Sequence, residues 1–533
     1  MLLVPNVTLR DGVDERRLVA EHLGVRPDRI RSAALVRRSL DARHRRQKWL
    51  GVYQVEVDDE APILRRGIAG VRPWNERDDG RYGLAKPAMT VGPSTGPKSA
   101  IVVGTGPAGL FSALFLAEAG YRVTVLERGG PVEERVTAVN AQWRGKVPLD
   151  PENNLVFGEG GAGTFSDGKI YTRRRDGELG YIFRTLIEFG ADAQAVQESW
   201  AHLGTDKIRA ILPPFRERLW SLGADLRYHA RVDALVVDGG RCRGVVLADG
   251  TVIEGSPVLV ATGHSARDAV KMMLDAGAAG ESRGIAIGAR IEHPQTAIDA
   301  GRYGTDARGE LPPATYRLAF HPDRGLPART FCMCPGGMVV PASNHPERVV
   351  VNGMSFAARR GFWANSALIV EVGREVYGSD DPMAGFAWQD QIERAAWSAG
   401  GGGYVAPAQR VVDLLEGRGS ADVPKTSYPH GVVATDLRDV LPAVITDGMA
   451  AALKVFERQL PGFASADGVL IAPETRTTSP IRFLRTERGE STTLPGLFPV
   501  GEGAGYAGGI VSSALDGLRA ARAIVGSGGE ESG

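Results

Sequence analysis

The N-terminal stretch of the chain carries both helical and strand-like patterns. Apolar residues recur at helical spacing over residues 14–23, and strand-like runs cover 30–36 and 49–57. Residues 71–98 then contain several prolines and glycines without hydrophobic periodicity, which is typical of a linker. We therefore expect a small α/β module over residues 1–70, followed by a linker.

A strand, a glycine turn, a helix and a second strand follow one another from Ser99. The strands are predicted at 100–103 and 122–126, with the helix between them at 107–119. This order is one βαβ unit, which begins a parallel sheet. Three alternating runs separated by Asp-Gly or Asp-Gly-Gly turns then predict a β-meander at 232–237, 241–247 and 251–253. An apolar run at 258–261 predicts a further buried strand.

The middle of the chain has a different pattern. It combines short strand-like runs at 338–341 and 349–351 with helical runs at 365–377 and 390–399. We interpret residues 285–428 as an inserted α+β substrate domain, which divides a nucleotide-binding domain into 99–284 and 429–533. The predicted fold class is α/β: a Rossmann-like, three-layer nucleotide-binding domain with a β-meander, the inserted domain and the N-terminal module.

Positive and negative charges balance across the 533 residues, with 63 Lys and Arg against 63 Asp and Glu. No overall field therefore favours nucleic acid or an anionic membrane, and neither is expected as a partner. The chain has three cysteines, too few for a disulfide framework, and it has no apolar stretch of about 18 residues that would span a membrane. Because its start lacks a basic, signal-like segment, we expect a cytoplasmic protein.

A dinucleotide-binding fingerprint lies in the βαβ unit. The sequence GTGPAG occupies 104–109, directly after the first strand, and Glu127 ends the second strand 18 residues after Gly109. In such a unit the glycines permit a tight turn and a close approach of the pyrophosphate to a helix N-terminus, and the carboxylate accepts hydrogen bonds from the adenosine ribose. The expected cofactor contacts here are Gly104, Gly106, Pro107, Ala108, Gly109, Glu127 and Arg128.

A second glycine-rich segment near the C-terminus separates FAD from NAD. An apolar strand at 497–500 leads to Gly501 and Glu502, and Gly508, Gly509 and Ile510 then open a helix. An acidic residue at a strand end can bind a ribityl hydroxyl, and a helix N-terminus can face the pyrimidine end of an isoalloxazine ring. We therefore expect noncovalent FAD. A nicotinamide, NADH or NADPH, would act only as a transient reductant, because no second fingerprint is present.

Together these segments resemble the FAD-binding set of the glutathione-reductase-like flavoprotein superfamily. The resemblance rests on GTGPAG with Glu127, on VLVATG at 258–263 and on LFPVGEGAGYAGGI at 497–510. More narrowly, the chain resembles a bacterial family known as FAD-dependent dehydrogenases or FAD-dependent proteins. That similarity is carried by FGEGGAGTFSDGK at 157–169, FCMCPGG at 331–337, VNGMS at 351–355 and ANSAL at 364–368.

The resemblance implies further cofactor contacts. A loop against the flavin and pyrophosphate would be formed by Gly160, Gly161, Gly163, Thr164 and Ser166, with Asp167 and Lys169 beside it. A glycine run with small hydroxyl residues also offers N–H donors to a flat polar ligand. At the sheet edge the contacts would be Ala261, Thr262 and Gly263, and the backbone of Val232 would meet the adenine.

Three places carry candidate chemistry, and each has a plainer alternative. Cys332 and Cys334 are either a redox pair or nucleophile near the flavin, or two small buried residues. His264 is either an acid–base group or a polar loop residue. The segment 474–482 lines the catalytic face in related folds, so Arg476, Ser479 and Arg482 are candidates, with surface salt bridges as the alternative for the arginines. We expect no metal site, because no second cysteine pair completes four ligands.

The predicted function is an FAD-dependent oxidoreductase that moves a hydride between a small organic substrate and flavin N5. Its electron partner would be external: NAD(P)H, a redox partner protein or dioxygen. Two alternatives remain. A local basic run in the N-terminal module, Arg37, Arg38, Arg43, Arg45, Arg46 and Lys48, would suit an RNA-directed flavoprotein. A protein that binds FAD without catalysis would be a sensor.

Overall fold

The computed structural model describes residues 1–41, 48–82, 98–170, 176–198, 202–305, 308–309 and 311–527. They divide into two compact units. Unit 1 contains the described residues of 1–88 and 169–203, and unit 2 those of 89–168 and 204–533. Among all these residues, no helix has the length and apolar character needed to cross a bilayer.

Unit 1 is an α/β module built on an antiparallel sheet with strand order β2-β3-β1-β4. The Asp14 side chain caps helix α1 by accepting a hydrogen bond from Arg17 N, and the apolar face of α1 packs on the sheet around Tyr53 and Val55. The strands are β1 (Leu2–Thr8), β2 (Ile30–Asp41), β3 (Lys48–Val57) and β4 (Arg72–Pro73). The helices are α1 (Glu15–Leu23), α2 (Ala61–Arg65), α3 (Glu76–Tyr82), α6 (Leu179–Glu188) and α7 (Ala193–Gln197).

Unit 1 differs from the prediction in two ways. The expected linker at 71–98 begins with β4 and α3, where buried Asp78 accepts two hydrogen bonds from Arg72, at 2.5 and 2.7 Å. Helices α6 and α7, expected within the domain at 99–284, also belong to this unit, and Glu198 pairs with Arg38 at 2.6 Å. Hydrophobic periodicity shows that a helix has a buried face, but it does not show which core receives that face.

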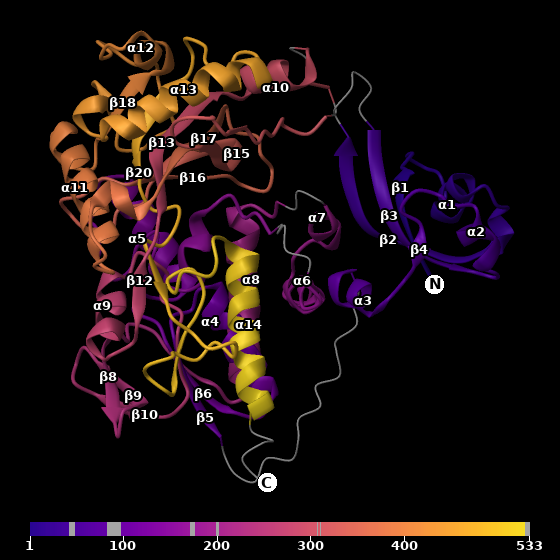
Figure 1. Ribbon diagram of the computed structural model, residues 1–533, viewed down its shortest axis with the longest axis horizontal. Coiled ribbons are helices and arrows are strands. Elements are labelled where there is room, and N and C mark those ends of the chain that lie inside the picture. The colour runs from indigo at the N-terminus through magenta and orange to yellow at the C-terminus, as the bar shows by residue number, and fades with distance from the viewer. Residues whose placement is uncertain are drawn as a thin grey trace. The chain divides into compact units, whose positions relative to one another are not determined.

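The nucleotide-binding part of unit 2 is a parallel sheet with strand order β22-β11-β5-β6-β7. Figure 1 labels two neighbouring strands of this sheet, β5 and β6. Alternate residues of β5 point to opposite faces. Ile101 and Val103 share a core with the meander, whereas Val102 faces α4, which packs against α14. The predicted three-layer, Rossmann-like arrangement with a meander is therefore confirmed.

This part of unit 2 contains sheet strands, meander strands, a short β-pair and helices. The sheet comprises β5 (Ser99–Val103), β6 (Arg122–Leu126), β7 (Asp225–Arg227), β11 (Val258–Val260) and β22 (Leu497–Pro499). The meander comprises β8 (Val232–Asp238), β9 (Arg241–Leu247) and β10 (Val252–Glu254), and β12 (Gly280–Ser282) pairs with β21 (Ile481–Phe483). The helices are α4 (Pro107–Glu118), α5 (Val132–Trp143), α8 (Thr205–Ser221), α9 (Arg267–Asp275) and α14 (Ile510–Ser527).

The insertion is built on a larger sheet with strand order β14-β15-β17-β13-β20-β18-β19, and β16 pairs with β15. Helix α13 contributes Ile445, Met449 and Phe456 to the core of this sheet. The strands are β13 (Ile285–Pro294), β14 (Ala319–Phe320), β15 (Ala328–Pro341), β16 (Val351–Met354), β17 (Trp363–Val372), β18 (Ala406–Arg410), β19 (Val432–Ala434) and β20 (Val469–Glu474). The helices are α10 (Gln295–Tyr303), α11 (Ala384–Ala399), α12 (Val411–Glu416) and α13 (Ala443–Gln459).

Two expectations for the insertion are wrong. Residues 365–377 were expected to be helical, but most of them form β17, which is buried along nearly its whole length between β15 and β13. Burial on both faces removes the alternation of apolar and polar residues that identifies a strand. The apolar run was therefore assigned to a helix. The insertion also continues beyond Tyr428, because β19, α13 and β20 join its sheet and core.

Candidate functional site

Four of the predicted cofactor segments converge in unit 2. A Cβ built on Gly161 would lie 3.0 Å from Gly106 Cα, and one built on Gly104 would lie 2.7 Å from the carbonyl oxygen of Ala261. Similarly, a Cβ on Gly163 would lie 3.2 Å from a side-chain carbon of Ile510. The fingerprint turn, the loop after Gly160, the end of β11 and the start of α14 therefore meet at one edge of the parallel sheet. This carboxyl edge is where open α/β sheets bind ligands.

The three fingerprint glycines serve three different purposes. Gly104 has a φ of 100°, a left-handed conformation that favours glycine. A Cβ on Gly109 would lie 1.9 Å from Gly104 O, so helix α4 can pack on the turn only without a side chain there. At Gly106, by contrast, a Cβ would meet no atom nearer than 3.9 Å apart from its chain neighbours, so protein packing does not require glycine at this position. The open space at the N-terminus of α4 fits a pyrophosphate, which supports binding of a dinucleotide.

Glu127 is buried and is held by the protein through both carboxylate oxygens. Oε2 accepts hydrogen bonds from Thr105 N at 2.9 Å and Thr105 Oγ1 at 2.6 Å, and Oε1 accepts from Gly129 N and Gly158 N, both at 3.0 Å. Glu127 thus joins the fingerprint turn to the loop that precedes Gly160. Its predicted contact with a ribose stays a prediction, and this bridging role is additional to it.

Arg135 of α5 was not identified from the sequence. Its side chain is completely buried and donates five hydrogen bonds, all to backbone carbonyl oxygens. The acceptors are Asn154, Leu155, Gly158, Glu159 and Gly161, at 2.6 to 3.2 Å. Burial lowers the pKa of this guanidinium to about 9. Arg135 therefore fixes the backbone of the loop that faces Gly106.

In the glycine-rich loop at residues 159–166, the side-chain hydroxyl groups form hydrogen bonds within the loop itself. Thr164 Oγ1 donates to Glu159 O at 3.0 Å, and Ser166 Oγ donates to Gly163 O at 2.8 Å. Asp167 is buried at the end of the loop. Lys169 belongs to unit 1, so the structure does not place it relative to this loop.

Arg128 and Val232 are two further predicted cofactor contacts. Arg128 forms ion pairs with Asp268 and, at 3.1 Å, with Glu152, and its guanidinium stacks 4.4 Å from the centre of the Phe157 ring. Val232 begins β8 and is buried in the core between the sheet and the meander. Both residues have structural partners, and their contacts with a cofactor stay predictions.

His264 and Glu502 follow two neighbouring parallel strands, β11 and β22. His264 Nδ1 lies 3.4 Å from Glu502 Oε1, and His264 Nε2 is buried without a hydrogen-bond partner. The backbone segments that follow the two strands are also in close contact. A Cβ built on Gly503 would lie 2.6 Å from the carbonyl oxygen of Gly263. A predicted catalytic residue and a predicted cofactor ligand therefore form one pair.

The predicted catalytic arginines have different surroundings. Arg476 is buried and forms a two-pronged ion pair with Glu393, at 3.0 and 2.8 Å, while its third nitrogen donates to Asn344 at 2.7 Å. Burial opposes ionisation of Glu393, but the charges of Arg476 and Arg267 lower its pKa to about 2. All the side-chain nitrogens of Arg476 are thus occupied, as expected of a structural ion pair.

Unlike Arg476, Ser479 and Arg482 contact the C-terminal glycine-rich segment at 501–509. The Arg482 side chain is 45% exposed, and its guanidinium lies 5.7 Å from the centre of the Tyr506 ring. Ser479 is buried, and its hydroxyl donates to Gly503 O at 3.4 Å. Arg482 is therefore the more accessible of the two arginines.

The two cysteines lie in β15 and form no disulfide. Cys334 is fully buried, with its sulfur 3.2 Å from an Arg290 nitrogen and 3.3 Å from Cys332 O. Arg290 is itself buried and paired with Glu474 at 3.0 Å. This arrangement supports a packed polar cluster within the sheet of the insertion.

Comparisons with known proteins identify the domains. Residues 98–141 match an FAD binding domain, residues 284–477 match the family described as "FAD-dependent protein, C-terminal domain-like", and residues 9–58 match a domain of unknown function. An uncharacterized protein from Clostridium beijerinckii is 39% identical over 432 residues, which covers 80% of this chain and 80% of that protein.

Two solved structures are more distant. CtdE, solved in complex with FAD, is 14% identical with a TM-score of 0.32 and covers 80% of this chain and 84% of its own. A geranylgeranyl bacteriochlorophyll reductase-like protein from Thermoplasma acidophilum is 12% identical with a TM-score of 0.35 and covers 82% and 80%. Likenesses of this size say nothing about function. The family matches, together with the Clostridium relative, confirm the resemblance and the cofactor that it implied: the chain belongs to the family of FAD-dependent proteins, and FAD is its cofactor.

Proposed function

We propose that the protein is an FAD-dependent oxidoreductase that moves a hydride between a small organic substrate and flavin N5. The observation that carries this proposal is the His264–Glu502 pair, which lies at the edge of the sheet where the glycine segments converge. A buried imidazole nitrogen without a protein partner is poised to bind a ligand or exchange a proton with it.

The His264–Glu502 pair can accept the proton that a substrate releases during its oxidation. When bound, FAD supplies a two-electron acceptor that takes up a hydride. As the hydrogen of a substrate C–H bond leaves with its electron pair, the proton of the adjacent O–H or N–H group passes to His264 Nε2. Glu502 faces Nδ1, so its negative charge stabilises the resulting imidazolium. The substrate thereby loses two electrons and two protons. We propose that an external acceptor, NAD(P)+, a redox protein or dioxygen, then takes these electrons from the flavin; for hydride transfer in the opposite direction, NAD(P)H would supply them.

The decisive experiment separates catalysis from simple flavin binding. The purified protein is mixed anaerobically with NADH, NADPH and a set of alcohols and amines, and the visible flavin spectrum is followed; the reduced protein is then exposed to dioxygen and quinone acceptors. We expect bleaching by at least one donor and recovery with one acceptor. His264→Asn should slow reduction by an alcohol or amine about 10²- to 10⁴-fold while retaining FAD. A flavin that no donor reduces and no acceptor reoxidises would support the sensor alternative.

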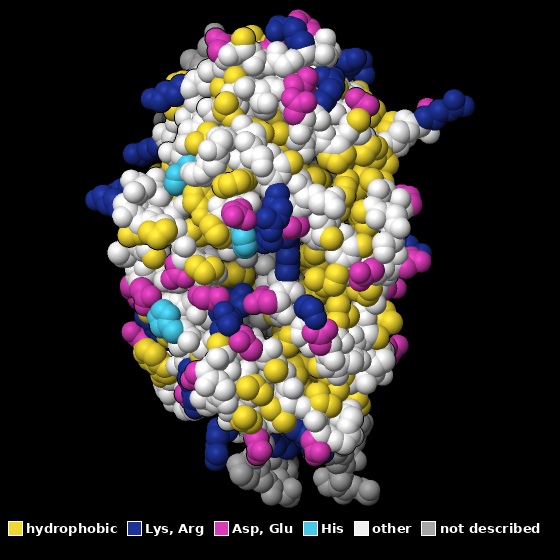
Figure 2. Space-filling model, turned by 90° about the vertical axis from the view of Figure 1, so that its left-hand side faces the viewer, with side chains coloured by type: hydrophobic (Ala, Val, Ile, Leu, Met, Phe, Trp, Pro, Cys, Tyr) yellow, Lys and Arg dark blue, Asp and Glu magenta, His cyan; other side chains and the backbone are white. Residues whose placement is uncertain are grey.

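The RNA-directed alternative has weaker support. Of the basic run, Arg43, Arg45 and Arg46 lie outside the described residues. Arg38 pairs with Glu198 at 2.6 Å and stacks on Trp49. Figure 2 shows a face of unit 2, on which positive and negative side chains are interspersed. Failure of the protein to retard tRNA at low salt would eliminate this alternative.

A further inference from the structure

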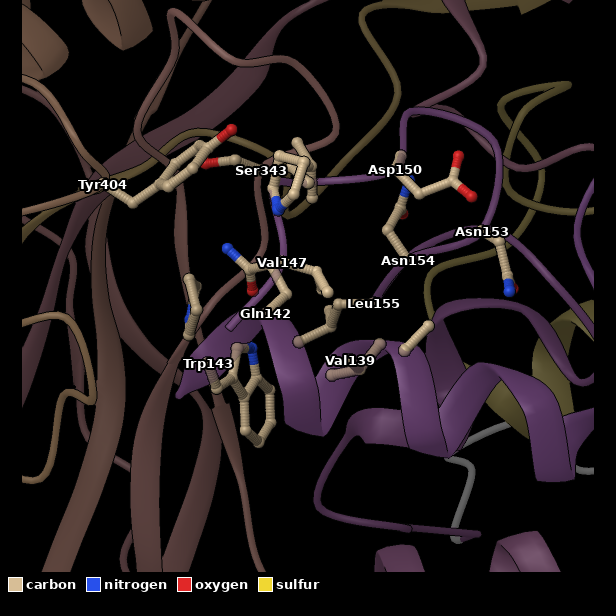
Figure 3. Close-up of a pocket in the computed structure, with 14 residues that line it drawn as sticks. Val139, Gln142, Trp143, Val147, Asp150, Asn153, Asn154, Leu155, Ser343 and Tyr404 are labelled. Carbon is tan, nitrogen blue, oxygen red and sulfur yellow. The ribbon is translucent and has the colours of Figure 1, made fainter. Parts of the chain in front are cut away.

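A hollow lies in unit 2, between α5 and the insertion (Figure 3). It is open to solvent, and its empty space together with that solvent measures about 430 Å³. Helix α5 and the segment after it form one wall, and residues that follow β15 and α11 form the other. The lining residues are Ala138, Val139, Gln142, Trp143, Val147, Pro148, Leu149, Asp150, Asn153, Asn154, Leu155, Pro341, Ser343 and Tyr404.

Most of the wall is apolar or aromatic. The labelled side chains in Figure 3 include Trp143, Val139 and Leu155 beside α5, with Tyr404 opposite. The Trp143 ring also meets the Phe165 ring edge-on, with centres 6.1 Å apart. Phe165 belongs to the glycine-rich loop that faces Gly106, so one aromatic contact connects this hollow to the cofactor segments.

The backbone at Tyr404 is unusual. Its φ is 68°, a left-handed conformation that is uncommon for a residue with a side chain. It ends a run with Gly401, Gly402 and Gly403, whose φ values are 74°, 89° and 63°. The Tyr404 carbonyl accepts a hydrogen bond from buried Tyr428 at 2.9 Å, which holds the strained residue in place. Strain of this kind is retained where the surrounding structure imposes it, often at ligand sites.

The charge of the lining selects among ligands. Among the described residues that line the hollow, Asp150 is the only charged one. Asn154 is fully used by its own loop, because its oxygen accepts from Val156 N and Phe157 N and its nitrogen donates to two carbonyls. With no cationic side chain among these described lining residues, a carboxylate or phosphate ligand would be unpaired there, whereas an amine could pair with Asp150.

We propose that this hollow binds a neutral or cationic aromatic compound. This binding does not depend on the oxidoreductase function proposed above. Stacking on Trp143 and Tyr404 would hold the ring, and Asp150 would favour an amine on the side chain of the compound.

Three phenols of similar size but different charge test the site: tyramine, a cation; tyrosol, neutral; and para-hydroxyphenylacetate, an anion. Their dissociation constants are measured by calorimetry on the FAD-loaded protein. We expect tyramine and tyrosol to bind, tyramine more tightly, and the anion at least roughly tenfold more weakly than tyrosol. Equal binding of the anion would overturn the proposal.

Substitutions of lining residues test whether tyramine binds in this hollow. Trp143→Ala should weaken tyramine binding roughly tenfold or more, while Trp220→Ala, which removes a 51% exposed tryptophan outside the lining, should not change it. Asp150→Asn keeps the oxygen that accepts from Glu152 N at 2.8 Å but removes the charge, so tyramine should lose its advantage over tyrosol.

Because Trp143 packs on Phe165, Trp143→Ala also removes a contact of the glycine-rich loop, and substitutions at the rim therefore provide a second measurement. Val147 is 45% exposed, so Val147→Glu and Val147→Lys should fold normally and shift the tyramine dissociation constant in opposite directions. No shift in either variant would overturn the proposal. A protein whose flavin cycles but which binds no phenol contradicts this inference alone; one that binds phenols with an inert flavin contradicts the oxidoreductase function alone.

Discussion

His264 Nδ1 lies 3.4 Å from Glu502 Oε1, across the ends of two adjacent parallel strands. Because Glu502 is also the predicted ribityl ligand, it connects cofactor binding to the candidate proton carrier. Loss of one charge-assisted hydrogen bond costs about 1.5–3 kcal/mol, which corresponds to a roughly ten- to hundredfold loss of affinity.

Glu502→Gln should therefore fold, purify partly free of flavin and recover its colour with excess FAD. Flavin fluorescence quenching during FAD titration measures the affinity. Exposed Glu487→Gln serves as the matched control and should bind FAD normally. If Glu502→Gln binds FAD as tightly as the unaltered protein, Glu502 acts on His264 alone and the ribityl role must be withdrawn.

Gly106→Val should abolish FAD binding while the fold is retained. A Cβ at Gly106 meets no protein atom nearer than 3.9 Å apart from its chain neighbours, so the new side chain would occupy the space expected for the pyrophosphate. Circular dichroism checks the fold, and visible absorbance measures bound flavin. Gly526→Val, where an added Cβ also meets nothing within 4 Å, should stay yellow. A yellow Gly106→Val protein would show that the pyrophosphate binds elsewhere.

Arg135→Lys should destabilise the protein by about 3 kcal/mol and weaken FAD binding. A lysine has at most three donors and cannot reach five carbonyl groups, so buried acceptors are left unpaired. Urea unfolding measures the loss of stability. Arg144→Lys, an exposed change at the end of the same helix, should leave stability within about 0.5 kcal/mol of the starting value. Equal stabilities for the two variants would contradict the structural role of Arg135.

His293 should make the protein less stable in acid. Burial lowers its pKa from 6.5 to about 4, so between these values the unfolded chain takes up a proton that the folded protein does not. The free energy of unfolding should therefore decrease as the pH falls through this window, by at most about 1.4 kcal/mol per pH unit from this group.

His293→Gln removes the titration, and its amide can still donate to Phe463 O, which accepts from His293 Nε2 at 2.7 Å. Denaturant unfolding across the window should give a shallower slope for this variant, whereas exposed His321→Gln should keep the original slope. Glu393, with its pKa of about 2, loses its stabilising contribution only at lower pH, from 4.5 downwards. Identical slopes for all three proteins would show that His293 takes up its proton normally in the folded state.

Local sequence was sufficient to predict the cofactor segments. The turn conformation of Gly104 and the open space at Gly106 follow from residue type and spacing, because both are properties of one βαβ unit. The strands and the helix of the βαβ unit and the strands of the meander were predicted for the same reason. The convergence of the four segments at one edge then follows from the rule that ligands collect at the carboxyl ends of parallel strands.

Long-range contacts could not be predicted in this way. Arg135 lies in a helix rich in polar residues, so nothing in the sequence distinguishes it from a solvated arginine. Arg476 was predicted as a catalytic candidate because the sequence does not reveal its ion-pair partner, Glu393, which is 83 residues away along the chain. Residues 365–372 were misassigned because a strand buried on both faces shows no alternation.

The position of β22 in the parallel sheet constrains when the protein can mature. This strand, Leu497–Pro499, pairs with β11, Val258–Val260, so the whole insertion is synthesised between two neighbouring strands. Such a contact closes a long loop and forms late in folding. A chain that ends before β22 lacks the strand end that carries Glu502 and the helix that begins at Ile510. The flavin pocket can therefore be completed only after these two elements have been synthesised, and chains truncated before β22 should accumulate without colour.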